Sequence, residues 1–196
     1  MQKTIFSLAV VALFAACQPA LDQKEERTPE FVTTYFVNKA GKKEGILTKT
    51  DAKTRAIVQE SMYKDDLQDG EEKMFFPSGK VEELRHYKAG KPDGTAQTFY
   101  ESGVLRSEVT FVNGAMQGLY KKYYENKQVK ESVTFVDNFE NGAFEEFYEN
   151  GKPKTKGNYK FNTQFDEAME EGELVLYDSL GVVTKKMCAN GRCVTQ

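Results

Sequence analysis

The chain has 196 residues, of which 39% are hydrophobic and 29% are charged, so it is too apolar and too aromatic for a disordered protein. Its 14 Phe and 10 Tyr residues, with no Trp, indicate that aromatic packing supplies much of the core. The formal net charge of −3 gives no electrostatic reason to bind nucleic acid, and we exclude that class of partner.

The first 16 residues have the layout of a secretory signal. Lys3 precedes an apolar run that ends at Ala16, which is shorter than the roughly 20 residues of a membrane-spanning helix. Phe14-Ala15-Ala16-Cys17 resembles a bacterial lipobox. The resemblance implies that residues 1–16 are removed and that Cys17 is lipidated, which anchors the protein in the bacterial cell envelope, on the periplasmic or surface side of the outer membrane. The alternative is an ordinary cleaved signal with an incidental cysteine.

Residues 17–30 follow as the lipidated cysteine and a tether. The stretch from Gln18 to Glu30 is polar, charged and contains two prolines, a composition typical of a flexible linker. The folded domain is therefore expected over residues 31–196.

Glycine recurs with a fixed period in this domain. Gly70, Gly94, Gly118 and Gly142 lie 24 residues apart, and Gly172 follows after 30. A weaker copy begins at Gly45. The fifth residue after each glycine is aromatic in all five clear copies, and the sixth is aromatic in all but the last, where it is Asp178. The fifth-residue column is Phe75, Phe99, Tyr123, Phe147 and Tyr177.

Each unit is predicted to be a β-hairpin. The first strand ends at the aromatic pair, and a turn such as Ser102-Gly103 follows, where glycine permits a positive φ. In the second strand apolar residues alternate with polar ones, as in a half-buried strand. In the copy that begins at Gly94, one face carries Leu105, Ser107, Val109 and Phe111.

The pattern Gly-x4-aromatic-aromatic-x2-Gly, followed by a short apolar strand, resembles the bacterial MORN variant repeat, which is found in antitoxin-like proteins of toxin–antitoxin systems. The resemblance implies an all-β fold: an elongated single sheet of stacked antiparallel hairpins. Six hairpins make about 12 strands and a sheet roughly 55 Å long. Each hairpin depends on its neighbours to bury its apolar face.

An insertion breaks the period in the fourth unit. Phe165, Ala168 and Met169 have the spacing of one helical face, so residues 164–171 are predicted to form a short helix. The acidic residues of this segment lack the alternating spacing of a calcium loop, and we interpret them as a solvated face.

Cys188 and Cys193 flank Asn190-Gly191, a strong hairpin-turn signal. In an exported protein, two cysteines that face each other across a turn are expected to form a disulfide. Zinc is the alternative, but two cysteines without further ligands make a poor zinc site, and no metal or cofactor is predicted.

Catalytic chemistry is not expected. The one histidine, His86, is predicted to face solvent on a repeat strand, and no serine has the context of a nucleophile. The candidate binding residues are instead the sixth-residue row: Phe76, Tyr100, Tyr124 and Tyr148. We expect this row to line a partly exposed groove that binds peptide or glycan, or else to hold the hairpins together by stacking.

The sequence thus predicts a membrane-anchored, non-catalytic protein that acts as a protein-interaction or scaffold module of the envelope. One alternative is an antitoxin-like or immunity-like protein that neutralises an envelope or secreted toxin. A surface glycan-binding protein is the other.

Overall fold

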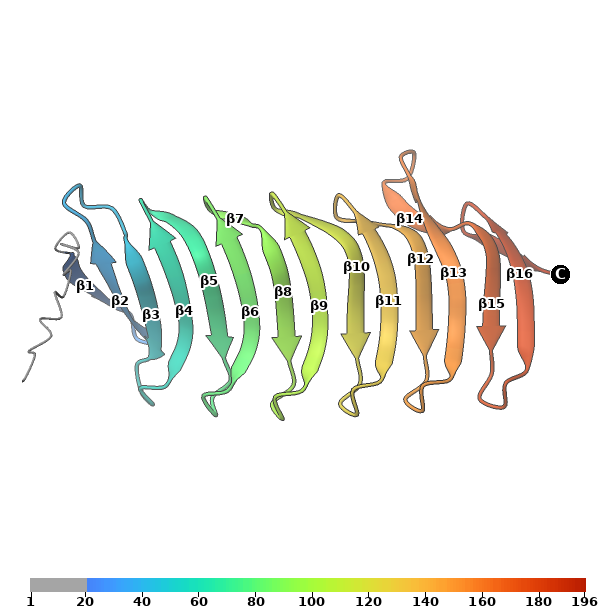
Figure 1. Ribbon diagram of the computed structural model, residues 1–196, viewed down its shortest axis with the longest axis horizontal. Coiled ribbons are helices and arrows are strands. Elements are labelled where there is room, and N and C mark those ends of the chain that lie inside the picture. The colour runs from blue at the N-terminus through green and yellow to red at the C-terminus, as the bar shows by residue number, and fades with distance from the viewer. Residues whose placement is uncertain (1–20) are drawn as a thin grey trace, which may run out of the picture.

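A computed structural model describes residues 21–196, so the predicted signal over residues 1–16 and the lipidation site Cys17 lie outside the described part of the chain. The described residues form one open antiparallel sheet of 17 strands (Figure 1). The predicted all-β class and the single sheet of stacked hairpins are confirmed.

Six hairpins make up the body of the sheet, and consecutive hairpins pair along their edges in chain order. They are β3 (Gly45–Asp51) with β4 (Ile57–Lys64), β5 (Leu67–Phe75) with β6 (Val81–Lys88), β8 (Gly94–Phe99) with β9 (Leu105–Val112), β10 (Ala115–Tyr123) with β11 (Val129–Val136), β12 (Phe139–Phe147) with β13 (Pro153–Asn162), and β15 (Gly172–Tyr177) with β16 (Val183–Ala189). The remaining strands are β1 (Asp22–Arg27), β2 (Phe31–Val37), β7 (Lys91–Pro92), β14 (Glu167–Glu170) and β17 (Arg192–Thr195).

Part of the segment expected to be a flexible tether is a strand. Along its whole length β1 pairs with β2, and the Tyr35 hydroxyl donates a 2.7 Å hydrogen bond to the Glu26 carboxylate. The side chains of β1 are all exposed, so the strand is held chiefly by backbone pairing to the free edge of β2. The polar composition of this segment predicts a linker, because composition carries no information about pairing with a strand elsewhere in the chain.

The predicted helix over residues 164–171 is wrong. The chain turns at residues 163–166 and returns as β14, which pairs with the outer half of β13. Phe165, the first residue of the supposed helical face, is 58% exposed and packs on no core. The end of β13 offers unpaired backbone groups at this point, and β14 satisfies them. The resulting hairpin projects beyond the line of turns that join the other hairpins (Figure 1).

Two kinds of turn join the strands. Between hairpins, except at the insertion, two successive residues have positive φ, as type I′ turns require; Asn113 and Gly114 are an example, with φ of 51° and 94°. Within hairpins, one residue at the end of the turn has positive φ. It is a glycine in four clear copies and Lys127, with φ of 69°, in the third.

The core lies on one face of the sheet, which we call the core face. Its best-buried cluster is Val133, Phe144, Leu174 and Cys188, and the rings of Phe144 and Tyr159 stack with centroids 4.2 Å apart. Gly157 is required here, because a Cβ at this position would lie 2.8 Å from the Phe144 ring.

The final hairpin places Cys188, rather than Ala189, in the core. In the other clear copies the repeat glycine pairs with an aromatic residue 17 positions later, as Gly94 pairs with Phe111. Gly172 pairs instead with Cys188, because this hairpin lacks the β-bulge that adds one residue to the second strand of the others.

Candidate interaction surfaces

The predicted row of Phe76, Tyr100, Tyr124 and Tyr148 follows directly after strands β5, β8, β10 and β12. All four side chains are half-buried. Each row residue comes four positions after a core-face residue, as Tyr148 follows the buried Phe144, and alternation along the strand therefore places the row on the core face. Fifth and sixth residues therefore face opposite sides, as the alternation predicts.

The row tyrosines bond to the next repeat. Tyr100 donates its hydroxyl to the carbonyl of Tyr123 at 2.7 Å, and Tyr124 donates to that of Phe147 at 2.9 Å. Tyr148 donates in the same way to Tyr177, also at 2.9 Å. In every case the acceptor is the fifth-residue aromatic of the following copy, so the row joins hairpin to hairpin.

Cations lie over two of these rings. The Arg106 guanidinium is 5.9 Å from the centroid of Tyr100, and the Lys130 ammonium is 5.3 Å from that of Tyr124. Both cations are carried by the residue that the β-bulge adds to the second strand. Tyr100 and Tyr124 thus make contacts within the sheet through both the hydroxyl and the ring face, which supports the stacking role over an open binding groove.

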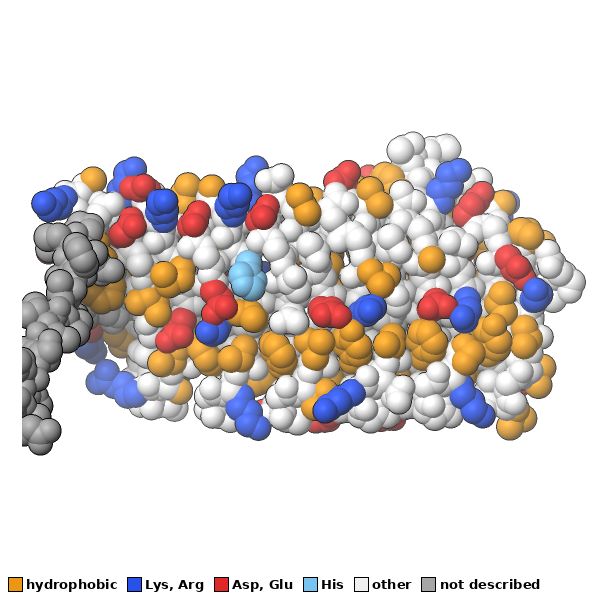
Figure 2. Space-filling model, viewed as in Figure 1, with side chains coloured by type: hydrophobic (Ala, Val, Ile, Leu, Met, Phe, Trp, Pro, Cys, Tyr) orange, Lys and Arg blue, Asp and Glu red, His pale blue; other side chains and the backbone are white. Residues whose placement is uncertain are grey.

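The fifth-residue aromatics form a second surface on the opposite, outer face. Each pairs in register with the first residue of the next strand, as Phe99 pairs with Leu105. The expectation that Leu105 shares a face with Val109 and Phe111 is therefore wrong, because the β-bulge at Arg106 shifts the alternation by one residue. Figure 2 shows this face, with His86 near its middle and a continuous apolar band toward the hairpin turns. We call it the outer band, and its members are Phe75, Val81, Phe99, Leu105, Tyr123, Val129, Phe147, Pro153, Tyr177 and Val183.

The outer band contains an open groove of about 530 Å³ between two hairpins, lined by Phe99, Leu105, Tyr123 and the turn residues beside them, including Lys127. Tyr123 donates a 2.7 Å hydrogen bond to the Glu108 carboxylate. Burial and this bond to Glu108 raise the pKa of Tyr123 to about 12. The hydrogen bond to Glu108 also restricts the orientation of the Tyr123 ring in the groove.

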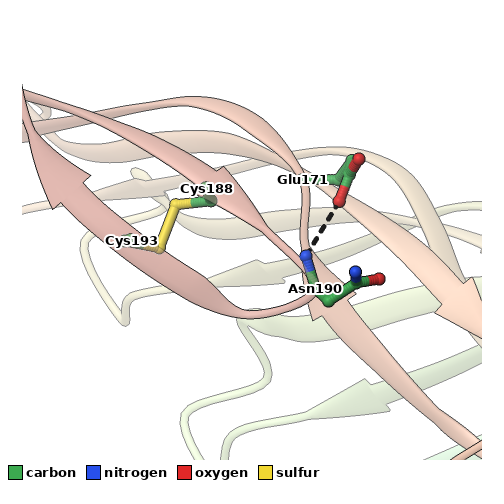
Figure 3. Close-up of a disulfide and its surroundings, with 4 residues drawn as sticks. All are labelled: Glu171, Cys188, Asn190 and Cys193. Carbon is green, nitrogen blue, oxygen red and sulfur yellow. Dashed lines mark hydrogen bonds between the residues drawn. A yellow bond between two sulfur atoms is a disulfide. The ribbon is translucent and has the colours of Figure 1, made fainter.

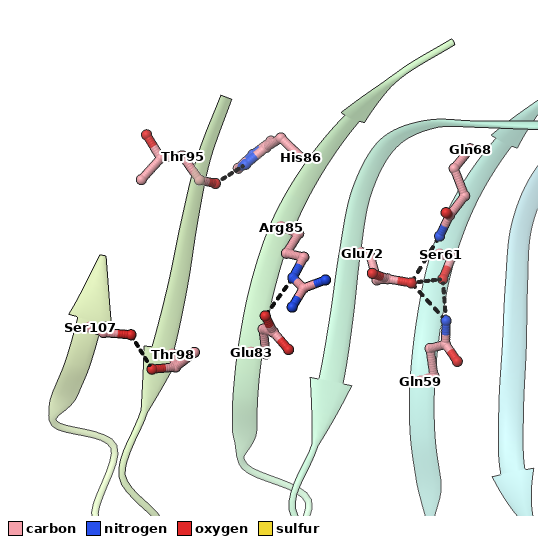
Figure 4. A network of polar contacts seen from close by, with 10 residues as sticks. All are labelled: Gln59, Ser61, Gln68, Glu72, Glu83, Arg85, His86, Thr95, Thr98 and Ser107. Carbon is pink, nitrogen blue, oxygen red and sulfur yellow. Dashed lines mark hydrogen bonds and ion pairs between the residues drawn. The ribbon is translucent and has the colours of Figure 1, made fainter. Parts of the chain in front are cut away.

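A polar network lies among the buried residues of the N-terminal half of the sheet (Figure 4). One oxygen of the buried Glu72 carboxylate accepts hydrogen bonds from Gln59 at 2.7 Å, Gln68 at 2.8 Å and Ser61 at 3.2 Å. Arg85, opposite Glu72 in the register, pairs with Glu83. The network is internally satisfied and offers no reactive group, so we assign it a structural role.

His86 faces outward as predicted. Its Nδ1 lies 3.0 Å from the carbonyl oxygen of Thr95, and its Nε2 lies 4.0 Å from a Glu71 oxygen. Within residues 21–196, no group of three or more His, Cys, Asp or Glu side chains is placed to hold a metal ion. Nor does that part of the chain contain a helix that is long and apolar enough to cross a membrane.

Acidic residues next to the repeat glycine form a column that was not predicted from the sequence. Asp69, Asp93 and Glu171 each precede the glycine, and each carboxylate accepts the N–H of the first residue of the following type I′ turn, at 3.0, 3.0 and 3.1 Å. Their fixed offset from the glycine was the available signal. These hydrogen bonds attach each type I′ turn to the first strand of its own repeat.

The predicted disulfide between Cys188 and Cys193 is present (Figure 3). The two cysteines pair directly across β16 and β17. Close by, the Asn190 N–H donates to Glu171, so the terminal turn is held by a covalent bond and a hydrogen bond.

Comparison with known protein families identifies four consecutive repeats. Residues 68–89, 92–113, 116–137 and 140–161 match the family described as MORN repeat variant. These segments coincide with the four hairpins from β5 to β13, apart from the insertion. A comparison with curated proteins found no match.

Comparison with solved structures gave partial matches, of which two are described. A mutant of TarM from S. aureus, in complex with fondaparinux, alpha-GlcNAc-glycerol and UDP, is 17% identical over 49% of this chain and 19% of its own, with a TM-score of 0.35. A GtfA/B complex is 15% identical over 68% of this chain and 20% of its own, with a TM-score of 0.27. The chain spans about a fifth of the length of these proteins, and likeness at this level supports no conclusion about function.

Proposed function

We propose that the protein is a non-catalytic interaction scaffold of the bacterial cell envelope, which binds a protein partner along its outer band. The MORN repeat variant matches support a repeat module of this kind. Stacked repeats of identical geometry make a rigid, extended platform, a shape suited to recognition.

The outer band is the observation that carries this proposal. It crosses five successive hairpins without interruption, and none of the strands described forms a second layer over it. Charged side chains of both signs lie beside it, including the ion pair of Lys156 with Glu145. An apolar strip with a mixed polar rim has the composition of a protein-binding surface.

The core-face row is a weaker candidate. Its tyrosines donate their hydroxyl hydrogen bonds to the next repeat, which argues against a glycan site built on that row. In the outer band, Tyr123 makes a comparable bond to Glu108 of the preceding hairpin, whereas most other members are apolar side chains without a hydroxyl.

The test compares two charge insertions on the outer face. Leu105→Lys places a cation in the outer band, and Thr110→Lys places one on an exposed position of the same strand outside it. Residues 21–196 carrying either change are used to capture partners from envelope extracts, and any captured protein is then purified and titrated directly. A partner retained by Thr110→Lys and lost by Leu105→Lys, with both variants still folded, supports the proposal. Equal binding by both variants contradicts it.

We further propose that Cys17 carries the lipid that holds this scaffold at the membrane, since the lipobox-like residues precede it. Several acyl chains on one residue give stable anchoring, because each buried CH₂ contributes about 0.8 kcal/mol. Cells fed a palmitate analogue should label the wild-type protein and not Cys17→Ser. An unlabelled wild-type protein would contradict the lipid anchor without affecting the outer band.

A further inference from the structure

The two free edges of the described sheet differ in chemistry. Strand β1 presents six exposed residues, of which all but Gln23 are charged. A charged edge strand resists pairing with another chain. Strand β17, at the opposite edge, carries Arg192 as its single charged residue. The C-terminal edge therefore lacks the protection that the N-terminal edge has.

Two observations show which residues of β17 direct their backbone N–H and C=O groups toward β16. The Cα atoms of Cys188 and Cys193 are 4.0 Å apart, which identifies a non-hydrogen-bonded pair, since hydrogen-bonded antiparallel pairs lie about 5.5 Å apart. The Gln196 N–H donates to the Lys185 carbonyl at 3.1 Å. Both observations direct the backbone groups of Val194 toward β16. Those of Cys193 and Thr195 consequently point away from the sheet, toward the open edge.

The last hairpin also carries exposed apolar side chains. Leu180 is 86% exposed, Val182 62% and Val194 68%. Val183 and Met187 are exposed as well, and Met187 lies opposite Val194 in the register. The surface is thus apolar at the strand edge itself, as well as in the turn.

Among the clear copies, two positions carry exposed apolar side chains in this hairpin alone. At the position of Leu180 the other clear copies have Ser78, Ser102, Asn126 and Asn150. At the position of Met187, opposite the residue after the repeat glycine, they have His86, Thr110, Thr134 and Asn158. Polar residues at these sites suit a solvated surface, whereas exposed Leu and Met side chains suit a covered one.

We propose that β17 is a dimerisation edge, on which β17 of a second copy of this chain pairs antiparallel about a two-fold axis through Val194. Cys193 of each copy then faces Thr195 of the other, and the outward backbone groups of both are satisfied. The two Val194 side chains meet on the outer face beside Met187. The disulfide fixes β17 to β16 in advance, which lowers the entropic cost of pairing.

A second copy is the occupant because the edge is self-complementary. The two residues with outward backbone groups are symmetric about Val194, so one strand supplies both halves of the ladder. In this register Arg192 lies opposite Gln196 of the second copy, and no like charges are brought face to face. This inference does not depend on the outer band or on the lipid anchor.

Sedimentation velocity over a range of concentrations tests the proposal. Residues 21–196 are used, since they contain every strand and contact described above. The wild-type protein should be a concentration-dependent dimer. Thr195→Pro removes an outward N–H and no internal hydrogen bond, and Val194→Lys opposes two cations across the axis; each should weaken dimerisation at least about tenfold.

The matched control is Val112→Lys, which places the same charge on an exposed valine of β9, away from the edge. It should dimerise like the wild type. Circular dichroism and melting temperature establish that each variant retains the sheet. A wild-type chain that stays monomeric overturns the proposal, and so does a dimer that survives both edge substitutions.

Discussion

At the scale of single residues, the row tyrosines link neighbouring repeats through one hydroxyl each. A hydrogen bond of this kind contributes about 1 kcal/mol net. Tyr124→Phe should therefore lower the free energy of unfolding by about that amount, because the Phe147 carbonyl loses its donor. Phe76 has the same place in its repeat without a hydroxyl, so Phe76→Tyr should raise stability. Urea unfolding of both variants measures the pair. No loss in Tyr124→Phe would show that the bond is dispensable.

Tyr159 makes stability depend on pH in the alkaline range. Burial, and next the nearby Glu140 carboxylate, raise the pKa of Tyr159 to about 12, whereas an unfolded tyrosine has a pKa of about 10. Above pH 10 the unfolded state releases a proton that the folded state keeps, so stability falls as pH rises toward 12. Tyr159→Phe keeps the ring that stacks on Phe144 and should show a shallower decline. Unfolding titrations between pH 9 and 12 compare the two, and parallel curves would contradict this assignment.

At the scale of elements, one hairpin turn holds a residue with a side chain in a backbone conformation that favours glycine. Lys127 has a φ of 69°, at the position where the other clear copies have glycine. A residue with a Cβ pays about 1–2 kcal/mol in this conformation, partly offset by the greater unfolded freedom of glycine. Lys127→Gly should raise the free energy of unfolding by about 1 kcal/mol. The reciprocal Gly103→Lys should lower it, and thermal melts of both check the sign.

The elements that could be predicted are those whose signals are local. Repeat glycines, turn dipeptides such as Asn113-Gly114 and two-residue alternation specify the hairpins without knowledge of their neighbours. The errors occurred where the partner lies elsewhere in the chain. Residues 167–170 become a strand because the end of β13 is open, and residues 22–27 do so because β2 offers an edge. Neither the helical spacing of apolar residues nor a charged composition indicates that a free strand edge is available nearby.

The candidate site was predictable to the same extent. Its aromatic columns and the disulfide follow from spacing and turn signals. The hydroxyl partners do not, because the acceptor of Tyr100 is the backbone of a residue 23 positions away, and its position depends on how hairpins stack. The cations over the tyrosine rings were not predictable either, because they depend on the β-bulge, in which Arg106 is an extra residue that two-residue alternation does not anticipate.

At the scale of the whole molecule, the sheet behaves as a one-dimensional array, in which each hairpin contacts chiefly its neighbours. Deleting residues 94–117 removes one period and joins Asp93 to Gly118, so every later residue keeps its face. We expect a folded sheet that is less stable and shorter by about 10 Å, the width of two strands. Small-angle scattering, with both proteins in the same oligomeric state, measures the length.

Deleting residues 94–116 is the matched control for that array. This protein retains one more residue, Gln117, yet the extra position either distorts the type I′ turn or reverses the alternation of every strand behind it. Reversal would turn Tyr120 and Val133 away from the core face, so this longer chain should be the less stable of the two. If both deletions unfold at the same denaturant concentration, the period of 24 does not specify the faces of the sheet, and its stability must arise from pairing of the backbone alone.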